Sequence, residues 1–141
     1  MKDSPDVRVF NENNRPDPDY ETTRFPKDLK TETKLLPTDA KDRKKVPLAS
    51  GVLDYFTSAL IEIAKVSHAG NEQHNPGQPL HWARGKSMDH PDTMLRHFVE
   101  RGTVDTDGVR HSAKMCWRAL AILQMELEAE GAPMARGASE K

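Results

Sequence analysis

The chain has very little cysteine. Cys116 is the only one among 141 residues, so the chain can form neither an internal disulfide framework nor a cysteine-based metal cluster. It also lacks a run of roughly 20 apolar residues, the length that a membrane-spanning helix needs. No apolar stretch typical of a secretory signal follows Met1. We therefore expect a soluble protein of a reducing, cytoplasmic compartment, without a membrane partner.

An excess of charge of either sign is missing as well. The 21 Lys and Arg residues stand against 22 Asp and Glu residues, which gives a formal net charge of −1. Without a global positive field, nothing draws the protein to nucleic acid, and any anionic ligand must be held by local groups. We expect no specific nucleic-acid partner.

Several motifs of common enzyme classes are absent. The chain has no Gly-x-x-x-x-Gly-Lys-Ser phosphate loop, no Gly-x-Gly-x-x-Gly dinucleotide turn, no Gly-x-Ser-x-Gly elbow and no His-Glu-x-x-His zinc helix. Cys116 lies within an apolar stripe, a position typical of a small core residue. No residue therefore stands out as a nucleophile for covalent catalysis.

Residues 1–45 are rich in charge and proline. The segment holds 21 charged residues and five prolines, and its few apolar residues follow neither a helical nor a strand period. Such a composition predicts either a disordered or loosely draped arm, or an extended segment that wraps a neighbouring subunit. The candidate anchors of the arm are its larger apolar side chains, Phe10, Tyr20, Phe25, Leu35 and Leu36.

Regularly spaced apolar residues predict a first and a third helix, and Pro91 near the start and Gly102 at the end of the stretch between them indicate a second. We expect these helices at residues 50–68, 87–101 and 109–130. An irregular loop rich in Asn, Gly, Pro and His is expected at residues 70–87. The fold class is therefore all-α, with the domain at residues 46–130 and a flexible tail at residues 131–141. The regular stripe of the third helix predicts helix packing that extends into an oligomer.

All six histidines lie between His68 and His111, interspersed with carboxylates. The carboxylates of this region are Glu62, Glu72, Asp89, Asp92, Asp105 and Asp107. Oxygen ligands of this kind hold Mg²⁺ or Mn²⁺, which bridge phosphate oxygens and activate water, and nearby cationic side chains balance the charge. Metal-assisted hydrolysis of a phosphoanhydride is the reaction that uses all of these parts.

Each of these residues also has a plainer interpretation. Glu62 either reaches solvent at the edge of the apolar stripe or enters a polar pocket as a metal ligand. Asp89 and Asp92 either complement the dipole of the second helix, with Arg96 as a surface partner, or form a divalent-metal site with Arg96 beside it. Trp82 either anchors the loop to the core or stacks on a planar base.

A resemblance adds to this interpretation. The elements that carry it are Gly70-Asn71-Glu72-Gln73-His74-Asn75-Pro76-Gly77, Leu80-His81-Trp82, Arg96-His97, Asp105-Thr106-Asp107-Gly108, His111 and Trp117-Arg118-Ala119-Leu120. Together they resemble the phage dATP/dGTP diphosphohydrolase family, the MazZ-like branch of the all-α MazG nucleotide pyrophosphohydrolases. The resemblance implies a helical bundle that works as a homodimer or homotetramer in the cytoplasm of an infected cell. The implied reaction converts a purine dNTP, dGTP or dATP, and water into dNMP and pyrophosphate with Mg²⁺ or Mn²⁺.

The resemblance also implies roles for individual residues. The expected metal ligands are Glu62, Asp89, Asp92 and Glu72, and the expected catalytic residues are Glu62, Glu72 and Asp92. The residues expected to bind the substrate are Lys86, Arg96, His74, Asn75, Trp82, His97, Asp107 and His111. The chain departs from the broader MazG pattern at Lys65, where that pattern has a second glutamate, and Glu72 is the candidate replacement. The departure keeps open a non-catalytic nucleotide-binding regulatory module or a phage structural module.

Overall fold

The computed structural model describes residues 35–139, which belong to one compact unit. The predicted arm anchors Phe10, Tyr20 and Phe25 lie outside the described residues, whereas Leu35 and Leu36 lie within them and are exposed. The helices are α2 (Ala40–Arg43), the π-turn η2 (Ala49–Leu53), α3 (Asp54–His74), the 3-10 turn η3 (Arg84–Lys86), α4 (His90–Val99) and α5 (His111–Ala129), and the strands are β1 (Trp82–Ala83) and β2 (Ala138–Ser139). The predicted all-α class is confirmed.

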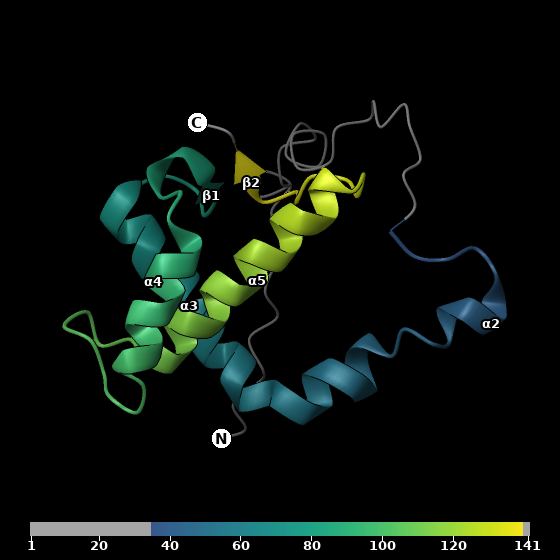
Figure 1. Cartoon of the computed structure of the whole chain (residues 1–141), viewed down its shortest axis with the longest axis horizontal. Coiled ribbons are helices and arrows are strands. Elements are labelled where there is room, and N and C mark those ends of the chain that lie inside the picture. The colour runs from purple at the N-terminus through teal and green to yellow at the C-terminus, as the bar shows by residue number, and fades with distance from the viewer. Residues whose placement is uncertain (1–34, 140–141) are drawn as a thin grey trace, which may run out of the picture. The chain divides into compact units, whose positions relative to one another are not determined.

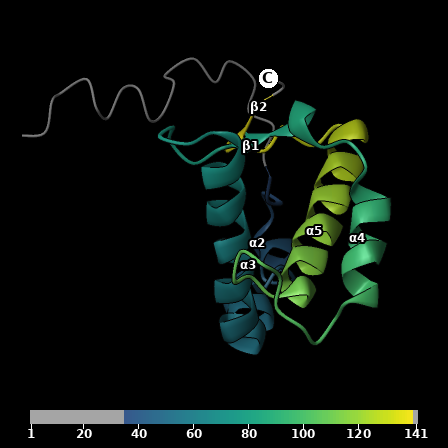
Figure 2. The same cartoon turned by 90° about the vertical axis from the view of Figure 1, so that its left-hand side faces the viewer.

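Three helices form the body of the described part. Helix α5 packs along α4 and also contacts α3, and both views show α4 and α5 side by side (Figures 1 and 2). Pro91 lies in the first turn of α4, where a missing backbone N–H costs no helical hydrogen bond. No helix within residues 35–139 is long and apolar enough to cross a membrane.

Helix α3 continues six residues beyond its predicted end at residue 68. The expected irregular loop therefore begins only after His74. The buried side chain of Asn71 donates a hydrogen bond to the backbone oxygen of Gln78 at 2.9 Å and accepts one from the backbone N–H of His81 at 3.4 Å. These bonds fold the following chain back onto the helix, which explains why polar residues 70–74 remain helical.

A two-stranded parallel pairing closes one end of the helices. Trp82 of β1 is in register with Ala138 of β2, and the Trp82 backbone N–H donates to the Gly137 oxygen at 2.7 Å. The segment after Gly131, expected to be frayed, is thus held to β1. Arg84, next to β1, forms a bidentate ion pair with Glu128 near the end of α5, and both side chains are nearly buried. The pair fixes the strand end to the helix end.

The buried apolar core of the described part is small. It consists of Val109, Ala113 and Ala121, all on or next to α5. The apolar stripe predicted for this helix continues as Leu120, Leu123 and Leu127, which are 51%, 50% and 44% exposed. One half of the stripe is therefore buried within the described part of the chain, and the other half stays about half-exposed.

Candidate functional site

A groove of about 790 Å³ runs between α3 and α5, with the segment around β1 at one end. Two indole rings contribute to its wall: Trp82 and Trp117 meet edge to face with their centroids 5.5 Å apart. The Trp117 indole N–H donates to the Ser67 hydroxyl of α3 at 2.9 Å. Trp117 therefore connects α3, β1 and α5 at the groove.

The predicted alternatives for Trp82 can be compared in this arrangement. The Trp82 ring meets the Trp117 ring edge to face, and the Arg84 guanidinium lies over the Trp82 ring, 4.6 Å from its centroid. These contacts fit the interpretation of Trp82 as an anchor of the loop, because a cation over an aromatic face and an edge-to-face pair both hold the ring in place.

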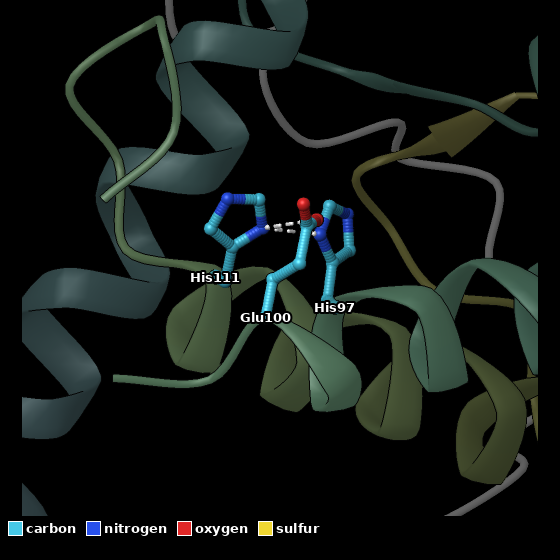
Figure 3. Close-up of side chains that lie close together, drawn as sticks. All are labelled: His97, Glu100 and His111. Atoms are coloured by element: carbon cyan, nitrogen blue, oxygen red, sulfur yellow. Dashed lines mark hydrogen bonds and ion pairs between the residues drawn. The ribbon is translucent and has the colours of Figure 1, made fainter. Parts of the chain in front are cut away.

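His97, Glu100 and His111 form the one group of three or more potential metal-binding side chains found in residues 35–139. The Nδ1 atoms of His97 and His111 are 2.9 Å apart, and Glu100 Oε2 lies 3.4 Å from His111 Nδ1. Figure 3 shows the three side chains pointing toward one another. Two ligands that are each about 2.1 Å from a metal lie roughly 3 Å apart in octahedral geometry, so these separations fit a shared ion.

Local structure explains how the three side chains meet. His97 lies in the last turn of α4 and Glu100 is its C-cap, so the i, i+3 spacing places both on one face. His111 begins α5, and its backbone N–H donates to the Thr103 oxygen at 3.2 Å, which draws the helix start back to the end of α4. Burial and then the neighbouring His111 lower the pKa of His97, which favours the neutral, ligating form of its imidazole.

Lys114 links the loop before α5 to the helix itself. Its ammonium group donates to Asp105 at 2.7 Å and to Asp107 at 2.6 Å. The Lys114 hydrogen bond is the main cause that lowers the pKa of Asp105 to about 2. Burial alone would lower the pKa of Lys114, but its two aspartate partners outweigh that effect and raise it. The three groups therefore stay ionised and hold the turn that precedes His111.

The four carboxylates predicted to bind metal do not form such a group in the described chain. Asp89 accepts a hydrogen bond from Arg96 at 2.7 Å, and this contact is the main cause that lowers the pKa of Asp89. Glu62 is half-buried and paired with Lys65, while Glu72 and Asp92 are exposed. The metal-binding and catalytic assignments of these carboxylates stay predictions.

Most of the predicted substrate-binding residues are gathered at the groove. The predicted residues that line it are His74, Asn75, Trp82, Lys86, His97 and Asp107. His111 adjoins the groove through its contact with His97, whereas Arg96 is occupied by Asp89. Their binding roles stay predictions, although the shared location is consistent with them.

The sequence reasoning missed several residues of the site. Glu100 was overlooked although its i, i+3 spacing from His97 is a readable signal on a helix. His90 and Arg118 also line the groove, and they come together from α4 and α5 across 28 positions of sequence. No periodicity or motif connects such a distant pair.

Comparison with known proteins gives one match. The family model described as dATP/dGTP diphosphohydrolase, N-terminal, matches residues 36–134. No curated protein and no solved structure matches the chain. The matched range includes the groove, the His97–Glu100–His111 group and all three long helices.

Proposed function

This chain belongs to the dATP/dGTP diphosphohydrolase N-terminal family and is a hydrolase of phosphoanhydride bonds, and from that premise we propose its substrate, metal and assembly. The proposed reaction converts a purine dNTP, dGTP or dATP, and water into dNMP and pyrophosphate. The observation that carries it is the position of His97, which lines the groove and at the same time belongs to the His97–Glu100–His111 group. A nucleotide in the groove would thus have its reacting end beside a metal-binding group.

The donor set supports one divalent metal ion at His97, Glu100 and His111. Of the two metals expected, Mn²⁺ fits two imidazole nitrogens and one carboxylate oxygen better than Mg²⁺, which prefers oxygen ligands alone. When bound, such an ion polarises phosphate oxygens and lowers the pKa of a bound water. The carboxylates Glu62, Glu72, Asp89 and Asp92 are not members of this group in residues 35–139, and their metal-binding roles stay predictions.

The protein's own residues have separate proposed tasks around the groove. Trp82 and Trp117 form an apolar wall against which the planar base can lie, and His74 and Asn75 offer hydrogen-bonding groups near it. Lys86 supplies an exposed positive charge for phosphate. The Lys114 network keeps the start of α5, and with it His111, in place.

We further propose that the protein works as a homodimer or homotetramer. Leu120, Leu123 and Leu127 follow one another at three- and four-residue spacing along α5, where they line one edge of the groove and stay about half-exposed, and a second copy that covers their exposed part would remove it from water. A phage origin, a place in the MazZ-like branch and a cytoplasmic location complete the proposal.

Metal-dependent pyrophosphate release from each of the four dNTPs tests the proposed function. Glu100→Gln keeps the size of the exposed ligand but removes its charge, so we expect at least about a tenfold lower rate with Mn²⁺ and weaker Mn²⁺ binding. Glu130→Gln is the matched control, because Glu130 is likewise exposed and caps the end of a helix. Wild-type protein that binds purine dNTPs but releases no pyrophosphate with either metal would instead be a regulatory binding module.

A further inference from the structure

Arg118 is a half-buried cation that makes no direct ion pair with a carboxylate of residues 35–139, although the charge of Asp89 acts on it from a greater distance. It lies on α5 and lines the groove, and Nη1 donates to the Ser87 hydroxyl at 2.8 Å and to His90 Nδ1 at 2.9 Å. Within residues 35–139 no carboxylate oxygen lies within 4.0 Å of its guanidinium. Arg84 shows the contrast, because its guanidinium is matched by both oxygens of Glu128. A partly desolvated charge without a direct ion-pair partner is typical of a binding site for a ligand of opposite charge.

His90 holds the guanidinium without neutralising it. Because Nδ1 accepts the hydrogen bond from Arg118, the ring carries its proton on Nε2 and is neutral. Burial and then Arg118 lower the pKa of His90, which keeps it so. The ring is only 4% exposed and lies against Trp82 and Trp117, with centroids 6.0 Å and 6.3 Å away. The buried, neutral His90 imidazole therefore fixes the orientation of the Arg118 guanidinium.

The remaining edge of the guanidinium suits a phosphate group. Nη1 is engaged by His90 and Ser87, whereas Nε and Nη2 make no hydrogen bond to any residue of the described chain. These two nitrogens form one side of the planar fork, the side that binds two oxygens of a phosphate in parallel. The preorganised Nη1 contacts reduce the side-chain entropy lost when the ligand binds.

The charges along the groove agree with an anionic ligand. Its lining contains three cations, Lys86, Lys114 and Arg118, and a single acidic residue, Asp107. Lys114 is compensated by Asp105 and Asp107. Lys86 and Arg118 make no direct ion pair within the described residues and therefore give the groove, which also has an aromatic wall, a net positive lining.

We propose that Arg118 is a phosphate-binding residue of the groove and that His90 and Ser87 are its positioning residues. The inference rests on the proposed function for the identity of the ligand, a purine nucleotide or its pyrophosphate product. Arg118 was not among the predicted substrate-binding residues. It lies on α5, on the side of the groove opposite α3.

Titration calorimetry with the full-length protein, in the presence of a chelator and without added metal, measures ligand affinity under conditions in which metal-dependent turnover does not occur. It therefore tests the role of Arg118 in binding separately from catalysis. The probes are inorganic pyrophosphate and, in a second arm, dGMP. We expect Arg118→Gln to weaken the binding of at least one probe about tenfold or more, and Arg118→Lys to restore it only in part, since an ammonium cannot bind two oxygens in parallel. Arg43→Gln, an equal loss of charge on exposed α2, should change affinity less than twofold.

Each result has a defined meaning. A loss for pyrophosphate alone assigns Arg118 to the leaving group, a loss for dGMP alone assigns it to the α-phosphate, and either supports the proposal. A folded Arg118→Gln protein that binds both probes within twofold of wild type, or a wild type that binds neither at millimolar concentration, overturns it. If Arg118→Gln loses its helical circular dichroism, the Arg118→Lys comparison decides in the same way.

Turnover provides the independent readout. If Arg118-dependent binding is present and no dNTP is hydrolysed, the subsite stands and the proposed function fails. If dNTP is hydrolysed and Arg118→Gln leaves both kcat and KM unchanged, the proposed function stands and the subsite fails. For a phosphate contact made before and during the reaction, we expect KM to rise more than kcat falls.

Discussion

Replacing Lys114 with methionine should destabilise the protein at neutral pH and much less in acid. The substitution keeps the length of a nearly buried side chain but removes the ammonium group that bridges Asp105 and Asp107. The lowered pKa of Asp105 means that its ionised form stabilises the fold above the unfolded value of 3.8. This contribution is lost as the pH falls from 3.8 toward about 2, where Asp105 is protonated in the folded state.

The size of the effect follows from the same shift. A pKa that falls from 3.8 to about 2 corresponds to roughly 2 kcal/mol before solvent is considered. The Asp105 side chain is 27% exposed, so screening reduces its share to about 1 kcal/mol. The pKa of Asp107 is also lowered; burial opposes this shift, and the hydrogen bond from Lys114 is the largest cause that favours it. We therefore expect Lys114→Met to lower the free energy of unfolding by about 1–2 kcal/mol at pH 7.

Urea unfolding at one fixed protein concentration, followed by circular dichroism, measures this difference. Lys65→Met is the control, because Lys65 makes an exposed i, i+3 pair with Glu62 that should contribute less than about 0.5 kcal/mol. The gap between the two variants should be largest at pH 7 and clearly smaller at pH 2.5, where part of the Asp105 contribution has been lost. Equal losses for Lys114→Met and Lys65→Met at pH 7, or a gap that persists unchanged at pH 2.5, would refute the electrostatic reasoning.

Two further changes test the packing around the groove and the proposed assembly. Trp117→Phe keeps the aromatic contact with Trp82 but loses the hydrogen bond to Ser67, so we expect a loss of about 1 kcal/mol in urea unfolding; a loss of the same size in a Ser67→Ala background would contradict this origin. Leu123→Glu places a charge on the apolar face of α5 and should reduce the mass measured by light scattering to that of the 15.9 kDa monomer, whereas Glu126→Gln should not; a wild type that already measures as a monomer would exclude the proposed oligomer.

Local patterns accounted for the helices but not for their ends. The regular spacing of apolar residues identified α3 and α5 because a helix that buries one face must repeat with the helical period, whereas Pro91 and Gly102 indicated where α4 begins and ends. The end of α3 was placed too early because residues 70–74 are polar, whereas the hydrogen bonds of Asn71 with Gln78 and His81, far along the chain from any helical signal, hold this last turn against the following segment. The β1–β2 pairing was missed because strands of two residues carry no period.

The sequence by itself determined the all-α class, the region that carries the chemistry and the family resemblance, because composition, periodicity and motif order are properties of the chain alone. The tertiary structure decided which of the candidate side chains meet. It placed His97, Glu100 and His111 together and set Arg118 beside His90. The physical reason is that ligation and charge compensation act over a few ångströms, and residues from α4 and α5 reach that separation only when the two helices pack.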